Sequence, residues 1–247
     1  MLIFTPNRRA ARELALALHR GLAGSLIAPT IRALGDLDEG DAADAFGVDA
    51  LDLKPSIPAA RRRGALARLI QAWRRAQHEP DLPPSSALAA ADELAGLLDQ
   101  AAIGDGVDWD GLRDLSLSAD LAEHWRISAS FLEIVGQAWP AYLAERGATD
   151  ELTRRRQAAE AMAARWVRNP PGHPVIIAGS TGAATATRIL MAGVLCLPRG
   201  VIVLPGLDPD LDGEGWEAVG RAPSHPQFTI KATLDVCLLY TSDAADE

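Results

Sequence analysis

Three arginines near the start of the chain stand where a helix ordinarily favours acidic residues. The segment Thr5–Arg12 has the sequence TPNRRAAR, and Arg8, Arg9 and Arg12 fall in the first two turns of a predicted helix. The positive end of the helix dipole disfavours each cation there by about 0.3–1 kcal/mol. Unpaired N–H groups and guanidinium groups together suit an anion such as a nucleic-acid phosphate. We therefore predict a phosphate site here. The alternative is a solvated face in a chain whose positive charge is 22 arginines of 24.

A second candidate is a short glycine-containing loop between an apolar run and a predicted helix. In α/β proteins, phosphates bind at helix N-termini beyond the carboxyl ends of strands. The loop lacks the lysine of GxxxxGK[ST] and the spacing of GxGxxG, and no Asp-Glu pair follows Val175–Ala178 to hold magnesium. A simple tight turn is the alternative. The candidate phosphate-loop residues are Gly179, Ser180, Thr181 and Gly182.

Other polar groups favour structural interpretations. Three carboxylates two residues apart in the segment 204–212 lack the glutamate of a calcium loop, so we expect a solvated loop and no metal site. His225 has no serine or cysteine partner that the sequence identifies, and we assign no catalytic residue. The arginine triplets 61–63 and 154–156 predict solvated helix faces, with DNA contacts as the alternative.

Composition limits the class of protein. The chain has 247 residues, 48% hydrophobic and 23% charged, which excludes collagen, long disorder, a disulfide scaffold and a membrane protein. The longest apolar run, Ile189–Leu197, is far shorter than the roughly 20 residues of a spanning helix. Two distant cysteines and no signal peptide predict a reducing, cytoplasmic location. The net charge of −9 means that the chain as a whole lacks the positive charge typical of nucleic-acid-binding proteins, but it allows local basic patches.

The local patterns predict an α/β domain with a helical insertion. Residues 1–50 and 174–235 form the α/β domain, with a parallel sheet, and residues 51–173 form an inserted all-helical domain. We expect Thr5 to cap the first helix and Pro140 to bend or split another. The predicted strands are 2–5, 25–29, 175–178 and 200–204, with a loop at 31–44. The predicted helices are 6–20, 58–78, 86–102, 183–197, and two more that begin at Ser118 and Thr149.

Both ends of the chain have unusual features. Residues 237–247, CLLYTSDAADE, resemble the forward translation of a transposase sequencing adapter. We therefore expect 236–247 to be an artefact and the natural sequence, with a net charge of −6, to end near Asp235. The strand at 2–5 begins at the terminus, so we expect an earlier strand to precede Met1.

Several segments together resemble the N-terminal part of the AddB family, the second subunit of the AddAB helicase–nuclease, in its alphaproteobacterial type. The resemblance covers residues 2–235, and its segments are specific only when taken jointly. They are FTPNRRAAREL at 4–14, PTIRALGDLD at 29–38, HWRISASFL at 124–132, AGSTG at 178–182 and VLPGLD at 203–208.

The resemblance implies a P-loop-NTPase-like, superfamily-1 helicase-like fold. Residues 2–14 then correspond to the motif that lies along single-stranded DNA. The predicted strand 175–178 corresponds to motif II, and residues 201–208 correspond to motif III. Ala178 and Gly179 stand in place of the motif II Asp-Glu pair, which implies an inactive helicase core. The DNA-binding residues implied are Thr5, Asn7, Arg8, Arg9 and Arg12.

The resemblance also implies partners and cofactors. Its complex repairs double-strand breaks by homologous recombination, with AddA as the motor and DNA as the substrate. ATP and magnesium serve that complex, and an iron–sulfur cluster belongs to a C-terminal nuclease region; we expect no cofactor in the present segment. Two alternatives stay open. One is a nucleotide-binding or phosphate-binding α/β enzyme that uses Gly179–Gly182, and the other is a purely structural subunit that supports AddA.

Overall fold

The computed structural model describes residues 1–21, 28–36, 53–103, 131 and 134–243. The chain divides into two compact units. One combines Met1–Leu53 with Arg155–Glu247, and the other is Lys54–Arg154. The first is an α/β unit and the second is helical, and each is described by itself below.

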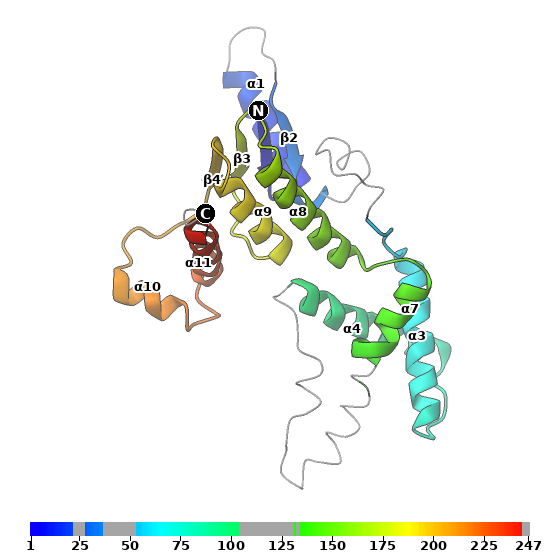
Figure 1. Ribbon diagram of the computed structural model, residues 1–247. Helices are drawn as coiled ribbons and strands as arrows, with labels where there is room; N and C mark the ends of the chain where they lie inside the picture. Colours follow the sequence, from blue (N-terminus) through cyan, green and yellow to red (C-terminus); the bar gives the residue numbers. More distant parts are fainter. Residues whose placement is uncertain (22–27, 37–52, 104–130, 132–133, 244–247) are drawn as a thin grey trace. The chain divides into compact units, whose positions relative to one another are not determined.

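A four-stranded parallel sheet forms the centre of the α/β unit (Figure 1). Leu2 pairs with Thr30 on one side and with Val175 on the other, and Val175 pairs in turn with Gly200. These short runs are rich in β-branched residues, which suit buried parallel strands. The predicted parallel α/β sheet is confirmed. The strands, in the spatial order β2-β1-β3-β4, are β1 (Leu2–Thr5), β2 (Thr30–Ala33), β3 (Val175–Ala178) and β4 (Gly200–Val203).

The helices between the strands cover opposite faces of the sheet. Helix α1 (Arg8–Gly21) connects β1 to β2, and α9 (Thr185–Leu195) connects β3 to β4. The two connections run from the centre of the sheet to opposite edges. Because such crossovers are right-handed, α1 and α9 lie on opposite faces. Phe4 and Ile177, which pair across β1 and β3, face the side of α9.

The main core lies on that side of the sheet and includes α8 (Glu151–Arg168). Phe4 is fully buried and meets Trp166 of α8 edge to face, with 6.4 Å between ring centroids. Each large apolar side chain buried here contributes about 1.5–3 kcal/mol. Because Met162 and Trp166 face the sheet, α8 from Arg155 onward belongs to the α/β unit. The helical unit therefore ends at Arg154, whereas the sequence pattern placed the boundary at 173.

The other face of the sheet is covered only in part among the described residues. Helix α1 packs over β1 and β2. On the edge strand β4, Val201 and Val203 are 45% and 51% exposed. A continuous apolar run such as 200–204 is typical of a strand buried on both faces, but the face that carries Val201 and Val203 is left partly open by the described residues.

Two local predictions near the N-terminus are also wrong. The second strand is Thr30–Ala33, which follows the expected strand 25–29 and overlaps the start of the expected loop 31–44. Ile31 pairs with Ile3, whereas Pro29 has no N–H to donate. Helix α1 begins at Arg8, two residues later than expected. Of the expected second strand, residues 25–27 lie outside the described residues, as do 37–44 of the expected loop.

The helices expected at 58–78 and 86–102 are confirmed, with each end shifted by one or two residues. Helices α3 (Ala59–Ala76) and α4 (Pro84–Ile103) pack against each other. A π-helical turn, η3 (Ile134–Ala138), runs directly into α7 (Trp139–Glu145). Pro140 is the second residue of α7, so the regular α-helical pattern begins only just before it and the helix is not split there. Most of the helix expected from Ser118 lies outside the described residues. The core residues include Leu66, Ile70, Ala91, Leu94 and Trp139.

The partly buried carboxylate of Asp150 links two helices of this unit, because it contacts both Trp139 and Arg62. The Trp139 indole N–H donates to Asp150 Oδ2 at 2.7 Å, and Arg62 Nε lies 2.9 Å from Asp150 Oδ1. The second contact is an ion pair whose N–H is not aligned for a hydrogen bond. Arg62 also reaches Asp99 at 2.9 Å. Part of the 61–63 arginine triplet is therefore structural.

Two further helices follow β4. Helix α10 (Gly213–Val219) precedes α11 (Phe228–Asp243), and α11 packs against α9 through a face that includes buried Ile230, Thr233 and Cys237. Helix α11 continues from the residues before Asp235 into the segment that resembles the adapter. Among the described residues, no helix has the length and apolar character that crossing a bilayer requires.

The packing of α11 predicts unequal reactivity of the two cysteines. Burial, and secondarily the charge of Cys196, raises the pKa of the Cys237 thiol to about 11, while Cys196 is exposed. At pH 8 the thiolate fraction of Cys237 is then roughly 100-fold below that of an ordinary cysteine thiol. We expect iodoacetamide to label Cys196 first by peptide mass spectrometry, and both residues at comparable rates in urea. Equal rates in the native protein would contradict the packing of α11.

Candidate nucleic-acid interface

The sheet topology brings the two predicted sites to one edge. From the centre of the sheet, the chain leaves β1 toward β2 and leaves β3 toward β4, so the carboxyl ends of β1 and β3 flank a topological switch point. Ligands of open α/β sheets bind in the crevice at this point. A Cβ placed on Gly179 would lie 3.6 Å from the ring carbons of Pro6. Two segments separated by most of the chain are therefore neighbours.

Thr5 positions this edge and does not face solvent. Its side chain is 3% exposed, and its hydroxyl lies 3.2 Å from the carbonyl oxygen of Asn7 and 3.3 Å from that of Arg32. The hydroxyl thereby links the end of β1 to β2 and to the start of α1. Thr5 is neither the helix cap nor an exposed contact, contrary to the sequence-based expectation.

Asn7 caps α1 in place of Thr5. Its side-chain oxygen accepts the N–H of Ala10 at 2.9 Å, which satisfies one of the donors left unpaired at a helix start. The first turn of α1 contains no acidic residue. Arg8, Arg9 and Arg12 are all exposed, and Arg8 and Arg12 share one face because they are four residues apart.

A surface cavity of about 470 Å³ adjoins the start of α1. Arg8 and Arg9 line it together with Pro6 and Asn7, which follow β1, and with Ala33 and Gly35 at the end of β2. None of the described lining residues is acidic. Arg12 is not among them and lies one turn further along the helix. The cavity residues that were not predicted as site residues are Pro6, Ala33 and Gly35. Their side chains have no charged or hydrogen-bonding group, so residue type alone does not mark them as site residues.

The Gly179–Gly182 loop is braced from within the protein. The Thr233 hydroxyl donates to the Thr181 carbonyl at 2.8 Å, and the buried Arg188 guanidinium donates to the Gly182 carbonyl at 3.1 Å. The Gly182 N–H donates to the Ser180 hydroxyl at 3.3 Å, and the Gly179 N–H donates to the Val203 carbonyl at 2.9 Å.

This bracing changes the interpretation of the loop. A phosphate cradle directs several backbone N–H groups at the ligand, but two of the four in this loop are used internally. Only those of Ser180 and Thr181 are left as donors to an anion. These hydrogen bonds are typical of a rigid turn. They are less typical of a phosphate-binding loop.

The other polar groups are engaged locally. Asp208 accepts the Asp210 N–H at 3.0 Å, Asp212 caps α10 by accepting the Gly215 N–H at 2.7 Å, and His225 Nδ1 accepts the Gln227 N–H at 3.1 Å. The described residues contain no cluster of three side chains suited to a metal ion. Arginines of both triplets form local contacts, including Arg63 with Asp92 and Arg156 with Glu160.

Comparison with known proteins identifies no related protein. Neither the models of protein families, nor the curated proteins, nor the solved structures contain a significant match to this chain. The site therefore has to be interpreted from its own geometry.

The bracing predicts that Gly182 is essential to the loop. Gly182 has a φ of +75°, and a Cβ there would overlap the Thr233 hydroxyl, whereas Gly206 has a φ of +62° with open space around it. We expect Gly182→Ala to destabilise the α/β unit clearly more than Gly206→Ala, for which backbone strain alone costs about 1 kcal/mol. Urea denaturation of both variants measures the difference. Equal losses would show that the packing of Thr233 on the loop is not as described.

Proposed function

We propose that this chain is a DNA-binding, catalytically inactive helicase-like region of the AddB family. In this proposal it works with AddA in the AddAB complex, in the cytoplasm, during repair of double-strand breaks by homologous recombination. The observation that carries the proposal is the pair Arg8 and Arg9, which line a cavity beside the switch point whose described lining residues include no acid. The parallel order β2-β1-β3-β4 is compatible with a P-loop-NTPase-like sheet, and the joint sequence resemblance narrows it to the helicase type.

Each residue of the proposed interface has a distinct part. Arg8 and Arg9 at the cavity, and Arg12 one turn on, pair with successive phosphates of a single strand. Asn7 holds the first turn of α1 in place, and Thr5 fixes that turn to the ends of both strands. Thr5 and Asn7 are thus positioning residues in this proposal.

The proposed lack of ATPase activity rests on the end of β3. Ala178 and Gly179 follow the strand where a motor would place an Asp-Glu pair for magnesium. ATP and magnesium then belong to AddA, and the iron–sulfur cluster belongs to the nuclease region of the family. The alternative of a nucleotide-binding enzyme is less well supported, because two of the four backbone N–H groups of the Gly179–Gly182 loop already donate hydrogen bonds within the protein.

Salt-dependent binding of single-stranded DNA tests the proposal. We expect the 247-residue chain to bind a fluorescein-labelled dT20 oligonucleotide in an anisotropy titration. The triple change Arg8→Gln, Arg9→Gln and Arg12→Gln should weaken binding by at least tenfold. It should also reduce the slope of log K against log salt by about 2, since each phosphate contact contributes roughly 0.7 for single strands.

Arg20→Gln supplies the matched control, because Arg20 is an exposed arginine in the last turn of the same helix. This change should leave the slope within error. An equal effect of Arg20→Gln would assign the binding to net charge alone. No DNA binding by the unmodified chain would favour a purely structural role beside AddA. Binding of ATP with magnesium that is lost in Ser180→Ala with Thr181→Ala would favour the nucleotide-binding alternative.

A further inference from the structure

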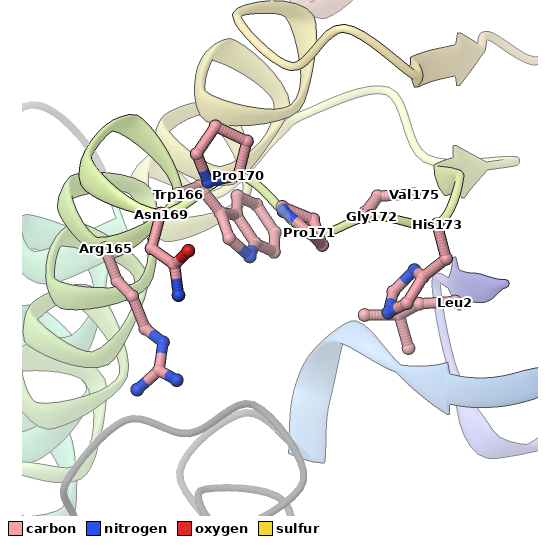
Figure 2. A pocket seen from close by; sticks show the side chains of 9 residues that line it. All are labelled: Leu2, Arg165, Trp166, Asn169, Pro170, Pro171, Gly172, His173 and Val175. Carbon is pink, nitrogen blue, oxygen red and sulfur yellow. The ribbon is translucent and has the colours of Figure 1, made fainter.

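A second cavity, of about 300 Å³, lies at the opposite edge of the sheet, where β1 and β3 begin. It is formed within the α/β unit by the end of α8, the loop 169–174 and the first residues of the two central strands. Leu2, Val175 and the prolines at 170 and 171 supply its apolar lining (Figure 2). No described residue lines both this cavity and the one at the start of α1.

The indole N–H of Trp166 is a buried donor at this cavity. Trp166 is 6% exposed and packs in the main core, edge to face with Phe4. Within the part of the chain that the structure describes, no group accepts a hydrogen bond from this N–H. Figure 2 shows the indole nitrogen on the side of the ring that faces the open space of the cavity. Because a buried tryptophan N–H usually has an acceptor, this donor indicates a ligand that carries one.

The His173 imidazole supplies an acceptor to the same cavity. Its Nδ1 lies 3.2 Å from the Pro174 carbonyl oxygen, which can only accept, so Nδ1 carries the proton in this contact. In the neutral ring Nε2 is then an acceptor for an N–H of a ligand. Two hydrogen bonds hold the loop, because the Arg199 guanidinium donates to the Gly172 carbonyl at 3.1 Å and the Leu2 N–H donates to the Pro174 carbonyl at 2.9 Å. The acceptor is therefore positioned before a ligand arrives.

Two further polar side chains border the cavity at the end of α8 (Figure 2). The Asn169 amide has both donors and an acceptor, and no described group forms a hydrogen bond with it. Arg165 already has an interaction partner, so no role in binding is assigned to its guanidinium. The cavity thus presents an indole donor, an imidazole acceptor and an amide beside an apolar lining. This combination suits a ligand that itself has both a donor and an acceptor.

We propose that this cavity binds a small uncharged heterocycle that presents a carbonyl oxygen beside a ring N–H, as a nucleobase does. The carbonyl oxygen accepts from the Trp166 indole, the ring N–H donates to His173 Nε2, and the ring packs on the apolar lining. A volume of about 300 Å³ is at the small end of the range of ligand pockets, so it suits a single ring and not a dinucleotide. The site is independent of the proposed DNA interface, because it lies at the other end of the strands.

Titration with two matched probes tests this site in the 247-residue chain. Uracil presents a carbonyl oxygen beside a ring N–H, and 1,3-dimethyluracil keeps the ring and both carbonyl groups but has no N–H. We expect uracil to shift the indole signal of Trp166 and the amide signals of Gly172 and His173 in ¹H–¹⁵N NMR spectra. The dimethyl compound should bind at least fivefold more weakly. Equal binding of the two probes, or shifts that map away from Trp166 and the loop 169–174, would overturn the proposal.

A histidine variant and its control test the assigned acceptor. His173→Asn removes the Nε2 acceptor at an exposed loop position, so it should weaken uracil binding at least fivefold without unfolding the protein. His19→Asn is the control, because His19 is exposed in the last turn of α1 and is not among the residues that line the cavity. An equal loss in His19→Asn would refute the assignment. Neither change should alter dT20 binding, and a loss of dT20 binding in His173→Asn would make the cavity part of the DNA interface and overturn the proposal of a separate site.

Discussion

The pairing of β1 between β2 and β3 is the interaction on which the α/β unit depends. It joins residues 2–4 to residues 175–177, so most of the chain lies in the loop that this pairing closes. Closing such a loop costs chain entropy that grows only slowly with its length, and the burial of Phe4 against Trp166 helps to offset it. Because all strands are parallel, their carboxyl ends share one edge, and the chain reverses direction at β1 and β3, which places a topological switch point there.

The two segments that meet at the switch point differ in character. One is the start of α1, where Asn7 caps the helix and exposed arginines supply positive charge. The other is the turn from Gly179 to Gly182, which Arg188 and Thr233 brace through its carbonyl groups. A charged helix start beside a rigid turn suits a ligand with phosphate groups, such as a nucleic-acid backbone.

The many arginines of the chain have different structural roles. Arg62 joins Asp99 and Asp150 in the helical unit, and Arg63 pairs with Asp92. Arg188 is buried and serves the loop after β3. The arginines at 8, 9 and 12 lie exposed in the first two turns of α1, against the helix dipole, and Arg8 and Arg9 also line a cavity.

Local sequence patterns determined the parallel α/β class and the helices α3, α4 and α9, and they predicted an anion site at the first turn of α1, because periodicity and helix charge are properties of neighbouring residues. Contacts between distant residues decided the rest. The pairing of Ile31 with Ile3 selected Thr30–Ala33 as the second strand, and the core beneath Phe4 assigned α8 to the sheet. The roles of Thr5 and Thr233, and the cavity at Arg165 and His173, depend on partners far away in the chain, which no local pattern encodes.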